Sequence, residues 1–402
     1  MDEKSMAVGL LVITLFIAVF SMLAKRLSTT IFTAPMIFLG FGYLLSKLEL
    51  IPATEMQSVL HLVAEIALIL LLFLDAAKID ITALKKDFVW PTRMLLIGLP
   101  LGMLIGTMFI SFMLPTWPLV AIALVAAILA PTDAALGQAV VENPHVPEKT
   151  RQTLIIESGL NDGLALPAIL LFASLTANVV HTGETNWLLF GFKQLVFGPI
   201  AGIVIGLMGG VLLMWAKKRD YTAEVYEGVG AIAMAVASYL LAGFIGGNGF
   251  IAAFVAGLGF GYIVKDKCKF VFEFTESEGQ GLVWVAFLLI GLLLIPDALK
   301  HLTFTTFSII LVSLFLVRPL AIWISLIGTD ADFRTRLFFG WFGPRGLATV
   351  LFALTIAHEI GAEYGEQILY LAVNTVWISA LLHGVTAIPG ANWYASKSPH
   401  SS

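Results

Sequence analysis

The chain has 402 residues, of which 59% are hydrophobic and only 12% are charged, with a net charge of −4. Ordinary soluble domains carry about 25% charged residues, so this composition excludes a soluble globular enzyme, a disordered chain and a disulfide scaffold. The small net charge argues against a nucleic-acid-binding protein, and a single cysteine, Cys268, cannot form a disulfide within the chain. The sequence predicts an all-α polytopic membrane protein that contacts the lipid bilayer.

Apolar segments long enough to cross a bilayer recur along the whole chain. A membrane-spanning helix needs about 20 mostly apolar residues. Thirteen segments are predicted to span: 6–24, 31–46, 57–77, 88–113, 117–141, 152–176, 187–215, 224–244, 247–264, 281–296, 304–327, 335–358 and 366–388. Between the ninth and tenth spans, residues 265–280 alternate Lys, Glu and aromatic residues and are predicted to form a cytoplasmic interfacial linker.

The distribution of Lys and Arg between the loops predicts the orientation of these spans. Fifteen Lys and Arg residues lie in the connections after odd-numbered spans, whereas only Lys47 and Lys300 lie after even-numbered ones. Basic loops face the cytoplasm. We therefore predict that the N-terminus is outside, the C-terminus is cytoplasmic, and the protein lies in the plasma (inner) membrane.

Several ionisable residues fall well inside predicted spans, where a charge is costly and marks a candidate functional site. These residues are Glu65, Asp133, Glu157, Asp162, Arg318 and Arg345, with Asp75 near the cytoplasmic end of its span. At 1.5 Å per residue, Asp133, Asp162 and both arginines lie about 12–15 Å from the cytoplasmic edge. Four charges from four helices are thus predicted to meet near the bilayer midplane.

Two of these charges sit where a span is predicted to break. The fifth span contains Ala130-Pro131-Thr132-Asp133, and the twelfth contains Gly343-Pro344-Arg345-Gly346. Proline removes a backbone donor and glycine tolerates unwinding. The two spans run in opposite directions, and a crossed pair of broken helices is typical of secondary transporters. We expect Asp133 to compensate N-terminal and Arg345 C-terminal half-helix dipoles.

The sixth span carries the string Glu157-Ser158-Gly159-Leu160-Asn161-Asp162-Gly163. Ser158 and Asp162 share one helical face, and Glu157 and Asn161 share an adjacent one. We expect Gly159 and Gly163 to let the broken fifth span approach closely.

The same string supplies oxygen ligands for a monovalent cation. We expect Asp162, Ser158 and a freed carbonyl near Thr132 to bind the ion, with Asp133 contributing directly or through water. A single buried carboxylate holds either a proton or a cation, and this competition is the mechanism of exchange. If Asp162 alone titrates, one proton exchanges for one cation and no net charge moves.

At these residues the sequence resembles the monovalent cation/proton antiporters of the NhaP/NHE type. The resemblance lies in Thr132-Asp133, Glu157-Ser158 with Asn161-Asp162, Gly343-Pro344-Arg345-Gly346 and Arg318-Pro319. It implies inverted repeats, a homodimer and elevator-type electroneutral exchange, with roles in cation transport and pH homeostasis. It also implies a core at 88–176 and 304–388 and a scaffold and dimerisation region at 1–87 and 187–264, within one transmembrane unit of residues 1–402.

The resemblance also implies roles for individual residues. Asp162 resembles the ion- and proton-binding aspartate, and Thr132, Asp133 and Ser158 resemble its supporting ligands. Glu157 resembles a glutamate held by a core arginine, for which Arg318 and Arg345 have equally suitable depth. Asp75 resembles an acidic residue of the third span and is also explained as a carboxylate near Lys78; Glu65 fits either a scaffold hydrogen bond or a proton role. Sodium is the expected cation, and lithium and potassium suit the same ligands.

Other classes fit only part of the pattern. Asp133 and Asp162 at equal depth fit an intramembrane aspartyl protease, but that chemistry leaves two arginines unexplained. A cation channel is a further alternative, yet no filter-like repeat is visible. His358-Glu359 begins a zinc-protease pattern that fails at Ala362. We therefore predict a transporter that is not an enzyme and needs no cofactor.

The seven histidines are predicted to lie in loops or at span ends, with His145 as the candidate for pH control. They are His61, His145, His181, His301, His358, His383 and His400.

Overall fold

The computed structural model describes residues 3–27, 30–49, 53–79, 88–133, 138–141, 143, 146–180, 187–264, 268–357 and 359–396, and these residues form helices and no strand. The helices are α1 (Glu3–Leu27), α2 (Ala34–Lys47), α3 (Ala53–Ala77), α5 (Val89–Arg93), the π-helical turn η1 (Met94–Gly98), α6 (Leu99–Met113), α7 (Leu119–Ile128), α8 (Gln138–Val141), α9 (Glu148–Val180), α10 (Trp187–Lys218), α11 (Glu224–Phe244), α12 (Gly249–Val264), α13 (Lys269–Leu293), α14 (Ile295–Lys300), α15 (Phe304–Val312), the π-helical turn η4 (Ser313–Val317), α16 (Arg318–Ser325), α17 (Phe333–Trp341), α18 (Leu347–Ala357) and α19 (Ala362–Ala395).

Each of the thirteen predicted spans overlaps one or more of these helices. In the part of the chain that the structure describes, nine helices are long and apolar enough to cross a membrane, and α7, α12 and α18 are shorter apolar helices. One helix extends well beyond its predicted span: the helix of the tenth span, predicted at 281–296, begins at Lys269 and ends at Leu293. Residues 269–280 of the predicted linker are therefore the first turns of α13, which packs against α2, α3 and α11, while 265–267 lie outside the described residues.

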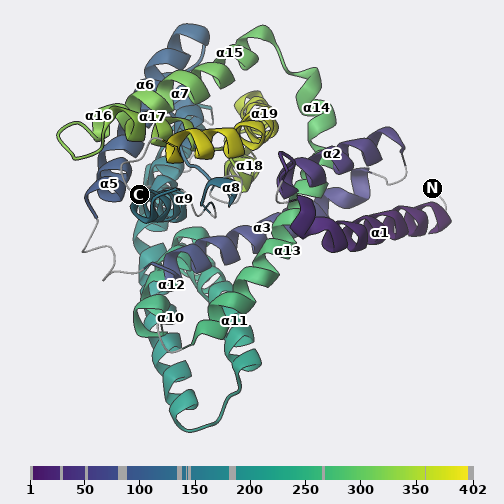
Figure 1. Cartoon of the computed structure of the whole chain (residues 1–402), viewed down its shortest axis with the longest axis vertical. Coiled ribbons are helices and arrows are strands. Elements are labelled where there is room, and N and C mark those ends of the chain that lie inside the picture. Colours follow the sequence, from purple (N-terminus) through teal and green to yellow (C-terminus); the bar gives the residue numbers. More distant parts are fainter. Residues whose placement is uncertain are drawn as a thin grey trace.

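The helices gather into two groups with α9 between them (Figure 1). One group contains α10, α11 and α12, and α12 packs on α3. The other contains α5 to α7 and α15 to α19. Helix α9 contacts α7 in the second group and α3, α10 and α12 in the first. Its polar residues therefore lie where the two groups meet.

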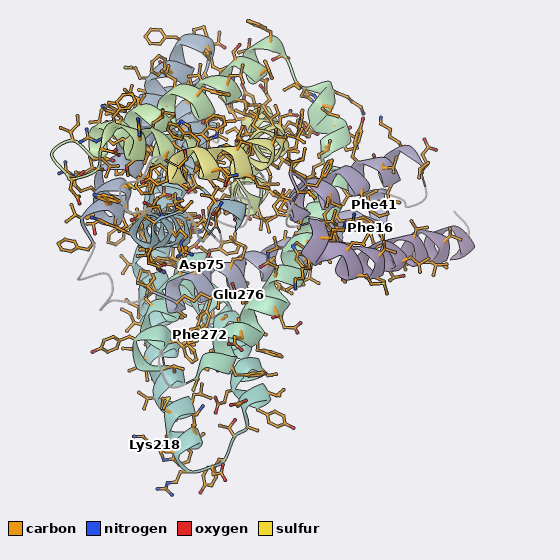
Figure 2. All side chains as sticks on the ribbon, viewed as in Figure 1. Phe16, Phe41, Asp75, Lys218, Phe272 and Glu276 are labelled. Carbon is orange, nitrogen blue, oxygen red and sulfur yellow. The ribbon has the colours of Figure 1, made fainter. Side chains whose placement is uncertain are left out.

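Helices α1 and α2 pack against α13 through aromatic rings. The rings of Phe16 and Phe41 stack with their centroids 3.7 Å apart (Figure 2). Phe38 stacks on Trp284 of α13 at 5.7 Å. Much of the remaining surface of α1 is apolar and exposed, including Met22 at 82%, as is normal for a helix in lipid.

The fourth and eleventh spans share an interruption. A π-helical turn, η1 in one and η4 in the other, is followed within two residues by Pro100 or Pro319. The two interrupted helices pack against each other. π-Helical turns are rare and occur mostly at functional sites. Here the turn η4 ends at Val317, directly before the buried residue Arg318.

Helix α17 begins at a polar cap on the loop after α16. The N-cap residue Asp332 accepts a 2.8 Å hydrogen bond from the backbone N–H of Thr335. The hydrogen bonds from Thr335 lower the pKa of Asp332 below its ordinary value, because they stabilise the charged carboxylate. This cap fixes the start of the short helix that leads into the second break.

Candidate ion-binding site

Two helices break at the centre of the molecule, and the broken segments cross. Helix α7 ends at Ile128, and residues up to Asp133 leave the helix. Helix α17 ends at Trp341, and α18 starts at Leu347. The backbone N–H of Asp133 donates a 2.8 Å hydrogen bond to the carbonyl of Pro344, which joins the two unwound segments. The predicted breaks are thus confirmed.

Charged side chains compensate the half-helix ends, as the sequence predicts. Arg345 Nη1 donates to the carbonyl oxygens of Ala130 and, at 2.9 Å, Pro131, beyond the C-terminal end of α7. Asp133 Oδ2 accepts a 3.2 Å hydrogen bond from the N–H of Leu347, at the N-terminal end of α18. A cation at a helix C-terminus and an anion at an N-terminus both oppose the helix dipole.

The two glycines of the second break make room for these charges. A Cβ atom at Gly343 would collide with the guanidinium of Arg318, and a Cβ atom at Gly346 would collide with the carboxylate of Asp133. Both positions therefore need glycine for space. The arginine and the aspartate reach the break only because these side chains are absent.

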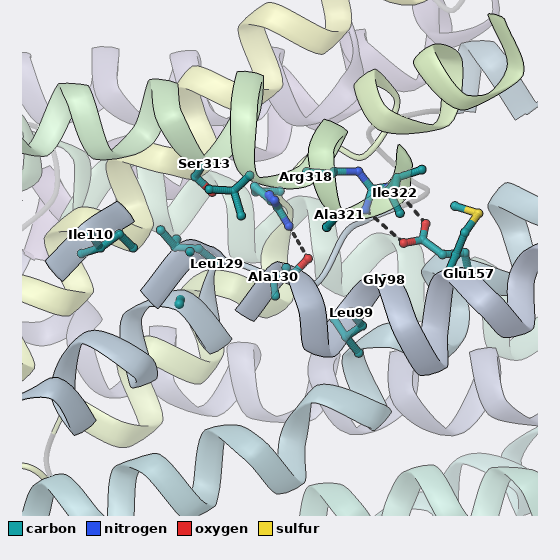
Figure 3. A pocket seen from close by; sticks show the side chains of 16 residues that line it. Gly98, Leu99, Ile110, Leu129, Ala130, Glu157, Ser313, Arg318, Ala321 and Ile322 are labelled. Carbon is teal, nitrogen blue, oxygen red and sulfur yellow. Dashed lines mark hydrogen bonds and ion pairs between the residues drawn. The ribbon is translucent and has the colours of Figure 1, made fainter. Parts of the chain in front are cut away.

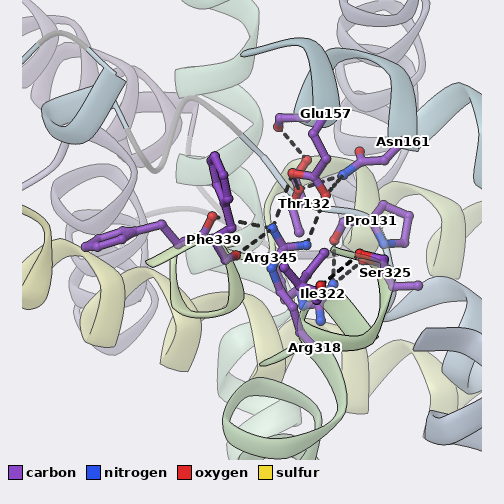
Figure 4. A network of polar contacts seen from close by, with 12 residues as sticks. Pro131, Thr132, Glu157, Asn161, Arg318, Ile322, Ser325, Phe339 and Arg345 are labelled. Atoms are coloured by element: carbon purple, nitrogen blue, oxygen red, sulfur yellow. Dashed lines mark hydrogen bonds and ion pairs between the residues drawn. The ribbon is translucent and has the colours of Figure 1, made fainter. Parts of the chain in front are cut away.

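Glu157 pairs with Arg318, which decides the choice between the two arginines. Arg318 donates from Nη1 to Oε1 at 3.0 Å and from Nη2 to Oε2 at 3.2 Å, and both residues are buried. Thr132 donates to Glu157 at 3.2 Å, and Asn161 Nδ2 donates to the Thr132 hydroxyl at 2.6 Å (Figure 4). A small cavity of about 30 Å³ adjoins the pair between α6, α7 and α16 (Figure 3), enough for about one water molecule.

Ser158 and Asp162 lie on α9 beside the first break. Ser158 Oγ donates a 2.7 Å hydrogen bond to the carbonyl oxygen of Thr132, so the hydroxyl oxygen and the carbonyl oxygen lie side by side. Asp162 is half-buried, and no described residue donates a hydrogen bond to its carboxylate. Asp133 and Asp75 are close enough to interact with it electrostatically. Oxygen atoms of this kind are the ligands that hard cations prefer.

Asp75 lies at this site. Its Cβ lies 3.4 Å from the position that a Cβ atom at Gly159 would occupy. The neighbouring Lys78 pairs instead with Glu276 of α13 at 2.7 Å, and Figure 2 shows Asp75 and Glu276 on the helices that cross in the middle. Glu65 does not lie beside Asp162. It precedes Asp75 by ten residues on α3, which places the two residues about 15 Å apart along the helix axis.

One prediction about α9 is wrong. Gly159 and Gly163 do not face the broken fifth span; Gly159 faces Asp75 of α3, and Gly163 faces the ring of Phe254 on α12. The reason is helical geometry. Ser158 and Asn161 occupy the side of α9 that contacts Thr132, and successive residues are rotated by about 100°, which turns the glycines toward the other group of helices.

The prediction for His383 is also wrong, because this histidine is buried inside α19. Its Nε2 lies 2.9 Å from the carbonyl oxygen of Trp341, at the end of α17. One turn earlier, Ser379 Oγ accepts a 2.8 Å hydrogen bond from the N–H of Arg345. Ser379 and His383, two side chains of α19, therefore contact the backbone of the second break on both sides and fix its position.

The i,i+4 spacing of Ser379 and His383 within an apolar span is the sequence signal that would have found this pair. Of the other histidines, His61 lies on α3 and His301 follows α14, whereas His145, His181, His358 and His400 lie outside the described residues.

Comparison with known proteins agrees with this fold. Residues 11–393 match the family model "Sodium/hydrogen exchanger, transmembrane". The "K(+)/H(+) antiporter NhaP2" of Shewanella sp. (strain ANA-3) is 29% identical over 275 residues, 67% of this chain and 46% of the relative. The chain thus spans about half the length of the curated relatives of this kind.

Two proteins of Methanocaldococcus jannaschii match over most of their length. The "Probable Na(+)/H(+) antiporter 2" is 24% identical and covers 89% of this chain and 90% of its own. The solved structure of the sodium proton antiporter MjNhaP1 superposes with a TM-score of 0.78 at 22% identity, covering 98% of this chain and 100% of that one. The chain is an integral membrane protein of the sodium/hydrogen exchanger family.

Proposed function

We propose that this protein exchanges a monovalent cation for a proton across the membrane, and that Asp162 carries both. The observation that supports this most directly is the charge balance of the site. Arg318 forms an ion pair with Glu157, and Arg345 donates hydrogen bonds to the carbonyls of Ala130 and Pro131. Asp133 faces the start of α18. Asp162 is left beside them without a donor from the described residues, so it needs a proton or a cation.

The ligands proposed for the cation are the Asp162 carboxylate, the Ser158 hydroxyl and the Thr132 carbonyl. The hydroxyl already donates its proton to that carbonyl, so its lone pairs are free to face an ion. Asn161 and Thr132 hold Glu157 in place. A bound cation favours the ionised carboxylate, and a bound proton abolishes the charge that attracts the cation. The two substrates therefore compete for one group.

The contacts of α9 support an elevator-type movement. Gly159 and Gly163 face α3 and α12, and small residues let helices pack closely in a membrane. We infer that the core (88–176 and 304–388) moves along the scaffold (1–87 and 187–264), within a homodimer in the plasma membrane. The N-terminus lies outside, and sodium is the transported ion, with lithium and potassium as the alternatives. The names of the relatives include both potassium and sodium antiporters.

The test is transport by the purified protein in proteoliposomes that carry a pH gradient. A pH-sensitive dye reports proton movement when sodium, lithium or potassium is added. We expect cation-dependent proton efflux in the wild type and its loss in Asp162→Asn. Asp297→Asn removes an exposed carboxylate outside the site and is the matched control, which should transport normally.

The stoichiometry is tested in the same vesicles with the membrane potential clamped or imposed. One-for-one exchange is indifferent to the potential, because it moves no net charge. A rate that follows the potential would overturn electroneutrality and point to Asp75 as a second titrating group. Exchange that persists in Asp162→Asn would overturn the role of Asp162 itself.

A further inference from the structure

A second polar cavity lies between the two groups of helices, away from Asp162. It has a volume of about 190 Å³ and is bounded by α3, α11, α12 and α18. Its polar lining consists of Glu65, His61, Tyr239 and Thr355, and Phe250 and Leu351 are among its apolar walls. One water molecule occupies about 30 Å³ in the liquid. The cavity is therefore large enough for a small cation with several waters.

Glu65 is the acidic group of this cavity. The Tyr239 hydroxyl is close enough to interact with its carboxylate, and Tyr239 packs over Gly249 at the start of α12. Among the described residues that line the cavity, none is a lysine or an arginine. A carboxylate placed in the membrane is costly. Such a group is stabilised when a cation or a proton reaches it.

Two phenylalanines of α12 lie between the cavity and α9. Phe250 lines the cavity, and Phe254 lies one turn further along α12, on the same face. The ring of Phe254 fills the space in front of Gly163, the residue next to Asp162. One helical turn of α12, about 5 Å, thus separates the side chain that lines the cavity from the one that packs on α9 beside Asp162. Helix α18 of the core and α3 of the scaffold close the sides.

We propose that this cavity is the outer vestibule of the transport pathway and that Glu65 is an entry site for the transported cation and the proton. This inference rests on the proposed antiport and on the proposed orientation, in which α3 leads outward from Asp75, through Glu65 at the middle of the helix, to an extracellular N-terminal end. Glu65 attracts both ions equally, because it acts through its charge. It thereby changes apparent affinity from one side of the membrane without changing the ion-binding residues.

The size of the effect follows from Coulomb attraction. For a unit charge about 15 Å from the ion and an effective dielectric constant of about 20, the local cation concentration changes about sixfold. At an outer pH high enough that protons do not compete for Asp162, removal of the Glu65 charge should therefore raise the apparent KM for the cation several-fold from the outer face only. Maximal rate and the apparent KM from the cytoplasmic face should stay unchanged, because Asp162 is intact.

The test uses a single thiol. The variant Glu65→Cys is made in a Cys268→Ser background, which leaves no other cysteine. Right-side-out and inside-out vesicles are treated with membrane-impermeant methanethiosulfonate reagents that add either a sulfonate or a quaternary ammonium. Glu366→Cys is the matched control, because Glu366 is exposed and lines a different cavity. Glu65→Asp, which keeps the charge, serves as a further variant.

We expect both reagents to reach the introduced thiol at position 65 from the outer face only. The sulfonate should restore the wild-type KM, the ammonium should raise it further, and Glu65→Asp should retain the wild-type value. Labelling from the cytoplasmic face, labelling from neither face, or equal effects of the two reagents would overturn the proposal. Loss of exchange in the wild type would instead contradict the proposed function, so the two failures are distinguishable.

Discussion

The buried charges of the site differ in how completely their neighbours satisfy them. Glu157 accepts two hydrogen bonds from Arg318 and one from Thr132. Arg318 also donates to the carbonyls of Phe339 and Phe342 at 3.4 Å. This pair is neutral as a unit, and both carboxylate oxygens and both terminal guanidinium nitrogens have partners. Asp162 has no such partner among the described residues, which is why we propose that its charge serves the exchange of cation and proton.

Removal of one member of the buried pair should destabilise the protein strongly. Arg318→Met leaves the Glu157 carboxylate buried and unpaired, at an expected cost of about 3–5 kcal/mol. The double variant Glu157→Gln/Arg318→Met removes both charges and keeps an amide for Thr132 and Asn161, so it should lose less. The free energy of unfolding is measured in mixed micelles through the fluorescence of the nine tryptophans.

The control for this comparison is Lys300→Met, which breaks the exposed pair with Asp297 and should leave unfolding unchanged, since exposed pairs contribute little. A double variant as unstable as Arg318→Met would contradict the assignment of the pair, because it would show that lost packing outweighs the unpaired charge.

At the scale of the elements, the two breaks stabilise each other. A helix end leaves up to four backbone groups without an intrahelical partner, which is costly inside a membrane. Arg345, which belongs to the second break, supplies donors to the end of α7, and Asp133, which belongs to the first, supplies an acceptor to the start of α18. Neither break is satisfied without the other.

Gly346→Ala tests this dependence, because the added methyl group would occupy the place of the Asp133 carboxylate. We expect Asp133 to be displaced from the start of α18 and transport to fall about tenfold or more, the equivalent of one hydrogen bond to a charged group. Transport and thermal unfolding are measured together. Gly230→Ala in α11 is the control, since nothing lies within 4 Å of its new methyl group and alanine favours helix.

Transport by Gly346→Ala at the rate of Gly230→Ala would contradict the close packing of Asp133 against α18. A defect in unfolding alone, with normal exchange, would assign Gly346 to stability rather than to the site.

At the scale of the whole molecule, local signals were enough for the breaks and the helical architecture, but contacts between helices were not predictable. Pro131 and Pro344 act on their own backbone, so their positions mark the breaks directly. The choice of Arg318 as the partner of Glu157 depends on the π-helical turn before Arg318 and on the space at Gly343. Neither feature can be inferred from how deep the two arginines lie in the membrane. The start of α13 was missed because its first turns are charged and are held by packing rather than by hydropathy.

Helices α9 and α12 are in contact, so the proposed movement of the core along the scaffold must carry Gly163 past Phe254. Gly163→Ala places a methyl group inside the space of the Phe254 ring, and such overpacking costs about 1–3 kcal/mol. We expect the turnover rate to fall about tenfold with little change in KM, because the ligands around Asp162 stay in place. Phe254→Ala in the same chain should restore part of the turnover.

The control for the methyl group is Gly102→Ala in α6, where the new atom makes only an ordinary 3.7 Å contact with Ala321. Turnover is measured in proteoliposomes over a range of cation concentrations, so that rate and KM separate. A change confined to KM would place Gly163 among the groups that shape the ion site. A fall in turnover that Phe254→Ala does not relieve would show that the ring is not the obstacle, and the path of α9 along α12 would have to be rejected.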